Sequence, residues 1–233
     1  MFHMVKPPLP HVRRGNAEDH QALRQAVIDA AMRLFQTQGL AGVTMRAVAS
    51  EVGVSAMALY RYFPNKAGLL QGLWTFTLAD LHDTLQARLD ALAPSGSARA
   101  RMRAVIDAFM GFFEARPDCY RLLFMTDQTL LETPETRWTA APAYQQTLQL
   151  ASEVTLAVAR DIGGSAARVR MASDLRFALT TGYLHARLVN TRYPWQDLDA
   201  LRQEAIEQIA CAVERCLLGP PDQADPTEPA EPA

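Results

Sequence analysis

The chain has 233 residues, of which 49% are hydrophobic and 21% charged, and its formal net charge is −2. This length fits one large or two small domains, and the apolar fraction is enough for a packed core. No run of 18 uninterrupted apolar residues occurs, and no apolar stretch suited to a secretory signal follows Lys6, Arg13 and Arg14. We therefore expect a cytoplasmic protein without a membrane span.

Composition and motifs also argue against metal sites, disulfides and catalysis. The three cysteines, Cys119, Cys211 and Cys216, form no CxxC pair and are best interpreted as small buried hydrophobic residues. The chain lacks HExxH, P-loop and GxGxxG motifs, and it has no Ser/His/Asp grouping at a known spacing. We predict that the protein is not an enzyme, binds no metal and needs no cofactor.

The first predicted elements are an arm and a helix. Residues 1–15 contain three prolines and no periodicity, which predicts a flexible arm. It is either an inert tail or a segment that brings His11, Arg13 and Arg14 to DNA. The first helix is expected to begin after Asn16 as its cap and to end at Gly39, with the following apolar positions at helical spacing: Leu23, Val27, Ala30 and Leu34.

Two short helices are predicted next, between Thr44 and Pro64. Thr44 is placed to cap the first, and Gly53 can adopt the left-handed conformation that ends it. Ser55 can cap the second, which must end before Pro64. Two short helices joined by a tight glycine-containing turn form a helix-turn-helix, whose second helix would enter a DNA major groove.

The rest of the chain is divided into further helices by proline, glycine and serine, and no alternating strand pattern occurs. The sequence therefore predicts an all-α protein. Residues 219–233, with five prolines and four acids, are expected to be disordered. The first of these further helices is capped by Asn65 and ends at Pro94, and the second ends at about Arg116. A short third helix carries Tyr120, Leu123 and Phe124, and a fourth begins at Thr133–Pro134 and reaches Ile162, with Pro142 as an alternative break. The last two helices cover roughly residues 166–192 and 197–218.

The segment from Val54 to Lys66 reads Val-Ser-x-x-x-Leu-Tyr-x-Tyr-Phe-x-x-Lys, and it resembles the N-terminal domain of the TetR family of bacterial transcriptional regulators. The resemblance continues through Ala30–Phe35, Gly39 and Leu69–Leu70, over residues 23–75. It implies a three-helix DNA-binding domain followed by a larger helical domain for ligand binding and dimerisation. The expected division is 1–15 arm, 16–66 helix-turn-helix domain, 67–218 effector and dimerisation domain and 219–233 tail.

The charge distribution fits this division. Residues 1–66 contain eight basic and four acidic side chains and carry a net charge of +4, whereas the remainder carries −6. The positive charge thus accompanies the motif that would meet phosphates, and the acidic remainder is expected to face away from DNA.

The resemblance implies roles for individual residues around the two short helices. Phosphate contacts are carried over to Thr44, Ser55, Tyr60, Tyr62 and Lys66, and the base-facing positions correspond to Arg46, Ala56, Met57 and Ala58. Met45 is included among the expected DNA-binding residues. Tyr62 has packing against the first helix as an alternative, and Arg46 has either a guanine contact or a phosphate salt bridge. The alanines and Met57 can offer only apolar contact, such as with thymine methyl groups, so DNA shape would contribute to specificity.

The resemblance further implies a ligand-responsive repressor that binds a palindromic operator in double-stranded DNA as a homodimer, through its last two helices. The candidates for contact with an apolar or amphipathic effector, between the helix after Asn65 and the helix over 166–192, are Trp74, Phe109, Tyr120, Trp138, Tyr144, Thr181 and His185. Core packing is the alternative for each. The alternative function is a DNA-binding protein without an effector, acting architecturally or through a protein partner. A protein with either function would be cytoplasmic and associated with the nucleoid. The sequence does not distinguish repression from activation.

Overall fold

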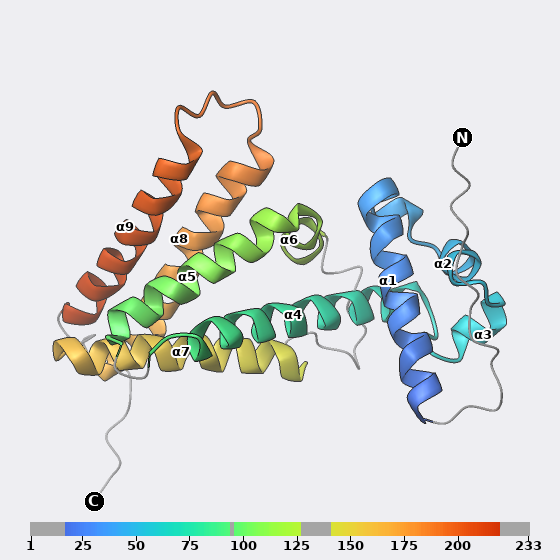
Figure 1. Cartoon of the computed structure of the whole chain (residues 1–233), viewed down its shortest axis with the longest axis horizontal. Helices are drawn as coiled ribbons and strands as arrows, with labels where there is room; N and C mark the ends of the chain where they lie inside the picture. The colour runs from blue at the N-terminus through green and yellow to red at the C-terminus, as the bar shows by residue number, and fades with distance from the viewer. Residues whose placement is uncertain (1–16, 94–95, 127–140, 220–233) are drawn as a thin grey trace, which may run out of the picture. The chain divides into compact units, whose positions relative to one another are not determined.

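The computed structural model describes residues 17–93, 96–126 and 141–219, and all its regular elements in these ranges are helices (Figure 1). The described residues form two compact units, one of residues 17–77 and 121–126 and one of residues 78–93, 96–120 and 141–219. The α-helices in chain order are α1 (Ala17–Gly42), α2 (Met45–Val52), α3 (Ala56–Tyr60), α4 (Lys66–Asp90), α5 (Ala98–Ala115), α6 (Pro117–Phe124), α7 (Pro142–Ile162), α8 (Val169–Val189) and α9 (Leu198–Leu218).

The first unit is built around α1, which packs on α2, while α2 packs on α3. Gly39 has φ 67° and ψ −167°, so the helical backbone is interrupted there, as the sequence predicts, although a further helical turn continues to Gly42. A residue with positive φ is accommodated cheaply only as glycine. The side chains that form the core of this unit are Val27, Ala31, Phe35, Val48, Val52, Leu59, Phe63, Leu69 and Leu73.

The predicted helix-turn-helix is present and its caps are the predicted residues. The Thr44 hydroxyl accepts a hydrogen bond from the Ala47 N–H at 3.1 Å, and the Ser55 hydroxyl accepts one from the Ala58 N–H at 3.1 Å. Gly53 ends α2 in the left-handed conformation, with φ 79°, and its N–H donates to the Ala49 carbonyl at 2.9 Å. These caps satisfy backbone groups that helix ends leave free and fix the turn between α2 and α3.

Close packing joins the start of α4 to the rest of the first unit. Asn65 caps α4, because its side-chain oxygen accepts a hydrogen bond from the Gly68 N–H at 2.8 Å. A Cβ atom placed on Gly72 would lie 2.7 Å from the Phe63 ring and 3.0 Å from Ile28. The absence of a side chain at Gly72 therefore lets α4 lie directly against α1 and the segment after α3.

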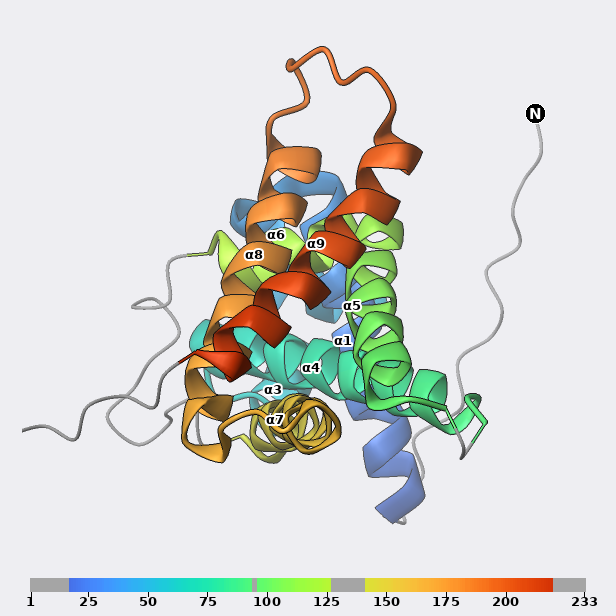
Figure 2. The ribbon, with the colours of Figure 1, turned by 90° about the vertical axis from the view of Figure 1, so that its left-hand side faces the viewer.

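The second unit is a bundle in which α8 and α9 form an antiparallel hairpin, and α5 and α7 pack on both of them (Figures 1 and 2). The core comes from every helix of the bundle: Leu81, Leu85, Met102, Ile106, Met110, Phe113, Leu150, Val158, Leu184, Ile209, Val213 and Leu217. Among the described residues, no helix has the length and apolar character needed to cross a bilayer.

Helix boundaries in the second unit differ in places from the sequence prediction. The predicted start at Thr133–Pro134 lies outside the described residues, and α7 begins at Pro142, which suits the first helical position. A 3₁₀ turn over Ala166–Arg168 follows Ser165, whose side chain makes no capping hydrogen bond, and α8 begins only at Val169. It ends at Val189, earlier than predicted, because a turn closed by the Tyr193 N–H on the Asn190 carbonyl precedes Pro194.

Candidate nucleic-acid interface

One face of α3 is exposed, whereas the opposite face packs into the core of the first unit. Leu59 is fully buried, whereas Met57 is 77% exposed and Tyr60 47% exposed. Ala56 and Ala58 are half-buried beside them. A large apolar side chain that remains this exposed on a short helix is available for contact with another molecule.

The two capping hydroxyls lie at the amino ends of α2 and α3 and are both exposed. Each hydroxyl oxygen accepts a backbone N–H of its own helix, so the O–H hydrogen of Thr44 or Ser55 stays free to donate. A phosphate oxygen is a suitable acceptor for such a donor. The same side chains can therefore hold the turn in shape and contact a DNA backbone.

Arg46 is the exposed cation on α2, and it forms no ion pair with any residue that the structure describes. Arg33, by contrast, is paired with Glu51, with 3.4 Å between Nε and the carboxylate. Arg46 is therefore available for a phosphate or for the O6 and N7 atoms of guanine, and both alternatives remain.

The structure shows burial or a contact within the chain for three other residues that were predicted to bind DNA. Met45 is only 7% exposed, because it shares the buried face of α2 with Val48 and Val52, so its side chain belongs to the core rather than to the DNA-facing surface. Tyr62 is half-buried, and its ring lies 5.4 Å from that of His20 in α1, which supports the packing alternative. The Lys66 ammonium group donates to the Leu40 carbonyl at 2.9 Å.

Four of the seven predicted effector residues, Phe109, Tyr120, Thr181 and His185, come together in the second unit around Phe113 and Tyr120. Trp74 is buried in the first unit, where its Nε1 donates to the Leu122 carbonyl at 3.1 Å. Trp138 lies outside the described residues. Tyr120 and Thr181 do meet in the second unit, because the Tyr120 hydroxyl donates to the Thr181 carbonyl at 3.2 Å, and burial raises the pKa of that hydroxyl. His185 is exposed, with its ring 6.4 Å from that of Tyr120.

The two remaining candidates are half-buried in the second unit. Phe109 belongs to an aromatic cluster, with its ring centroid 5.0 Å from that of Phe113 and 6.5 Å from that of Phe177. Tyr144 lies in the first turn of α7.

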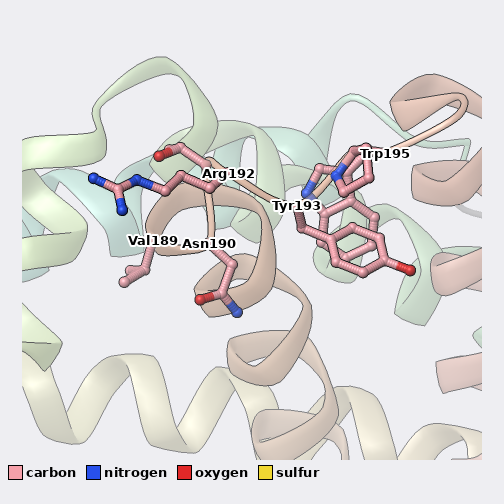
Figure 3. Close-up of a pocket in the computed structure, with 7 residues that line it drawn as sticks. Val189, Asn190, Arg192, Tyr193 and Trp195 are labelled. Atoms are coloured by element: carbon pink, nitrogen blue, oxygen red, sulfur yellow. The ribbon is translucent and has the colours of Figure 1, made fainter.

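A pocket of about 810 Å³ is lined by residues 189–195, in the segment between α8 and α9 (Figure 3). The rings of Tyr193 and Trp195 lie close together in it, with centroids 4.4 Å apart. None of the six described residues that were predicted to contact an effector lines this pocket.

The sequence prediction missed an ion network centred on Glu114 in α5. Its carboxylate accepts hydrogen bonds from the Tyr183 hydroxyl at 3.1 Å and from the Arg202 Nε at 2.7 Å, and it pairs with the Arg187 Nε at 2.9 Å. These groups are far apart in sequence, so their spacing gave no indication that they meet. Burial lowers the pKa of Arg202, but the hydrogen bonds to Asp107 and Glu114 outweigh it and leave that pKa raised.

An exposed second helix in a capped helix-turn-helix, followed by a helical bundle, defines the class of helix-turn-helix DNA-binding proteins. The model of bacterial regulatory proteins of the tetR family matches residues 27–73. The transcriptional activator FasR of Mycolicibacterium smegmatis is 30% identical over 166 residues, which cover 71% of this chain and 72% of that protein. The chain therefore belongs to the tetR family of bacterial regulatory proteins, which are DNA-binding transcription factors and not enzymes.

Two further comparisons show the range of its relatives. The nucleoid occlusion factor SlmA of a Marinomonas species is 33% identical over 101 residues, which cover 43% of this chain and 49% of that protein. The chain thus spans about half the length of the nucleoid occlusion factors that it matches. The structure of the transcriptional regulator FadR from Bacillus subtilis in complex with stearoyl-CoA shares the fold, with a TM-score of 0.58 and 18% identity over 81% of this chain and 98% of that chain.

Proposed function

We propose that this protein is a ligand-responsive transcriptional repressor that binds a palindromic operator as a homodimer. The observation that carries the proposal is the exposed face of α3, with Met57 and Tyr60 the most exposed, in the same helix-turn-helix as free donors at Thr44, Ser55 and Arg46. A short helix offering apolar side chains to base edges, between groups that suit phosphates, has the composition that major-groove binding requires.

The proposed functional division follows the sequence prediction. Residues 16–66 would bind DNA, residues 67–218 would bind the effector and the second subunit, and residues 1–15 and 219–233 would flank them. Such a regulator would act in the cytoplasm, on the nucleoid. The first 66 residues carry +4 and the rest −6, which supports DNA contact by the first part alone.

Effector control is supported by the course of α4. This single helix of 25 residues begins at Lys66, directly after the helix-turn-helix, and its residues from Leu78 onward belong to the second unit. An effector that binds the second unit would displace the α4 end next to the recognition helix, so that two recognition helices no longer match successive major grooves. The FadR structure with stearoyl-CoA shows that a protein of this fold holds an amphipathic ligand.

The proposal is tested by selecting bound sequences from random DNA with the purified protein, followed by a screen for compounds that release the selected site. We expect a palindrome whose half-sites are about one helical turn apart or slightly more. Because the coupling is reciprocal, the operator should weaken effector binding by the same factor by which the effector weakens operator binding. The coupling free energy is typically on the order of 1–3 kcal/mol, and calorimetry with and without operator measures it. Selection of a site without two-fold symmetry, or equal effector affinity with and without operator, would contradict the proposal.

The second candidate is a DNA-binding protein that acts architecturally or through a protein partner. The similarity to nucleoid occlusion factors over about half of their length favours it. The two functions separate in the same experiment, because a protein of the second kind would bind many chromosomal sites and would not be released by small molecules.

A further inference from the structure

The face of α8 that points into the bundle is polar in the middle. Its buried residues follow a helical stripe, Val169, Ala172, Arg176, Thr180 and Leu184. The more apolar Met171 and Leu179 lie on another side of this helix and are exposed. An arginine that is only 7% exposed therefore lies where a core helix normally carries an apolar residue.

Arg176 has almost no compensation for its charge. Its Nη2 donates to the Ala151 carbonyl of α7 at 3.2 Å, whereas its Nε is buried without a hydrogen-bond partner. It forms no ion pair with any acidic residue in the described ranges. Asp174 is two residues away on the same helix, but it is exposed and paired with Arg170 at 3.0 Å.

Two other arginines of this unit, Arg187 and Arg202, form ion pairs with carboxylates. Arg202 has both Asp107 and Glu114 as partners, at 2.6 and 2.7 Å, and Arg187 pairs with Glu114 at 2.9 Å. Within the described ranges, the bundle thus supplies carboxylates for these two arginines and none for Arg176. A buried charge without a counter-charge destabilises the folded state, so this arrangement is unfavourable unless an anion arrives from outside the chain.

A second donor on the same face of α8 is also without a partner. Ser173, one helical turn before Arg176, has a buried hydroxyl that makes no hydrogen bond. The neighbouring hydroxyl groups of Thr155 and Thr180 donate to carbonyls of their own helices, at 2.9 and 2.7 Å. The Nε–H of Arg176 and the O–H of Ser173 are therefore two buried donors, one helical turn apart on α8, that have no acceptor among the described residues.

Arginine suits an oxyanion because its guanidinium group is planar and donates two parallel hydrogen bonds. Burial lowers the pKa of Arg176 to about 10, so the side chain is still protonated at neutral pH. On α7, the buried side chains before and after Ala151 are Leu150 and Val154. An anion held by Arg176 would thus lie next to a helix that contributes apolar side chains to the core.

We propose that Arg176 and Ser173 bind the anionic end of the effector, and that the effector is an amphipathic carboxylate or phosphate whose apolar part lies along α7. This inference rests on the proposed function, since it names the chemical class of the ligand that would regulate DNA binding. Two hydrogen bonds from Arg176 and one from Ser173 satisfy the oxygens of such a headgroup.

Three probes of equal chain length test this proposal: dodecanoate, dodecyl phosphate and the uncharged dodecanol. Each is titrated calorimetrically into the wild-type protein, into Arg176→Met and into Arg170→Met, which removes an exposed arginine from the same helix. We expect Arg176→Met to lose affinity for the bound anion by about tenfold or more, while dodecanol binding and the Arg170→Met variant stay unchanged. The anion that binds tighter to the wild type identifies the headgroup as carboxylate or phosphate.

Thermal unfolding without any probe separates a ligand role from a structural one. If Arg176 serves a ligand, Arg176→Met should unfold at the same or a higher temperature than the wild type, because a buried unpaired charge has been replaced by an apolar group. A clearly lower unfolding temperature would assign Arg176 to the structure and overturn the inference. Arg176→Lys keeps the charge but not the planar fork, and we expect it to bind the anion more weakly than the wild type.

The outcomes also distinguish this inference from the proposed function. Failure of the wild type to bind either anion, or equal anion binding by Arg176→Met, would overturn the role of Arg176. Release of the selected operator by uncharged compounds in the same protein would leave the proposed repressor function standing. If no compound of any charge released the operator, the proposed function itself would fail.

Discussion

At the scale of residues, Glu114 shows how distant side chains are coupled in the second unit. Its carboxylate, on α5, accepts from Tyr183 and pairs with Arg187 on α8, and it also accepts from Arg202 on α9. Removing one partner from a largely buried ion network leaves the others uncompensated. The relative position of α5, α8 and α9 is therefore fixed by these ion pairs as well as by the packing of their apolar side chains.

Tyr183 should make the stability of the protein depend on pH in the alkaline range. Burial first, and then the charge of Glu114, raise the pKa of Tyr183 from 10.0 to about 12. The folded state thus keeps a proton that the unfolded chain loses, so this contribution is complete below pH 10 and is lost between about pH 10 and pH 12. Unfolding temperatures of the wild type and of Tyr183→Phe, measured from neutral to alkaline pH, should differ less as the pH rises. Parallel curves would contradict the raised pKa of Tyr183.

Lys66 offers a test of the DNA contacts. Its ammonium group donates one hydrogen bond to the Leu40 carbonyl and retains two further N–H donors for a phosphate. Lys66→Ala should weaken binding to all sequences similarly and lower the dependence of log K on log salt by about one. Tyr60→Phe is the matched control, because it removes a hydroxyl but no charge and should weaken binding with the salt slope unchanged. If Lys66→Ala changed neither the affinity nor the salt slope, the Lys66 side chain would contact only the Leu40 carbonyl and not DNA.

At the scale of elements, the turn between α2 and α3 depends on Gly53. Its φ of 79° is a conformation that costs an alanine roughly 1–2 kcal/mol. Gly53→Ala should therefore destabilise the protein by about that amount in denaturant unfolding. Gly111→Ala is the control within α5, where an added Cβ would lie 3.6 Å from Arg202, an ordinary contact, and should stabilise the helix by up to about 1 kcal/mol. Equal effects of both substitutions would contradict the role assigned to Gly53.

Elements with strong local determinants were predictable from the sequence, and those defined by distant contacts were not. Thr44, Gly53 and Ser55 act within a few residues of themselves, so the helix-turn-helix followed from its own pattern. The buried face of α8 did not follow, because Arg176 and Thr180 lie on it while Met171 is exposed. The Glu114 network joins side chains up to 88 positions apart, and periodicity within one helix contains no information about such a meeting.

The same distinction applies to the candidate DNA-binding site. The positions of Ser55, Met57 and Tyr60 on an exposed short helix were predictable, since Leu59 and Phe63 identify its buried side. The burial of Met45 was not, because an apolar residue in a first helical turn suits both a core and a thymine methyl contact.

At the scale of the whole molecule, we expect a homodimer formed through α8 and α9. The side of α8 opposite its buried stripe presents Met171, which is 53% exposed, and the small residues Ala178 and Gly182. A Cβ added at Gly182 would meet nothing within 4 Å in the chain itself, so a partner helix has room to approach closely there. A pair of such helices from each subunit would form a four-helix interface with two-fold symmetry.

Light scattering at micromolar concentration should therefore give about twice the chain mass of 25.8 kDa. Ala178→Arg should shift the mass towards that of one chain, because a long charged side chain would prevent close approach of the two α8 helices. It should also weaken operator binding, since each recognition helix would then bind its half-site without the other. Gln149→Arg adds the same charge on the exposed side of α7 and should leave both the mass and the operator affinity unchanged. A wild-type mass near 25.8 kDa would rule out the dimer, and a dimeric Ala178→Arg variant would move the interface away from this face of α8.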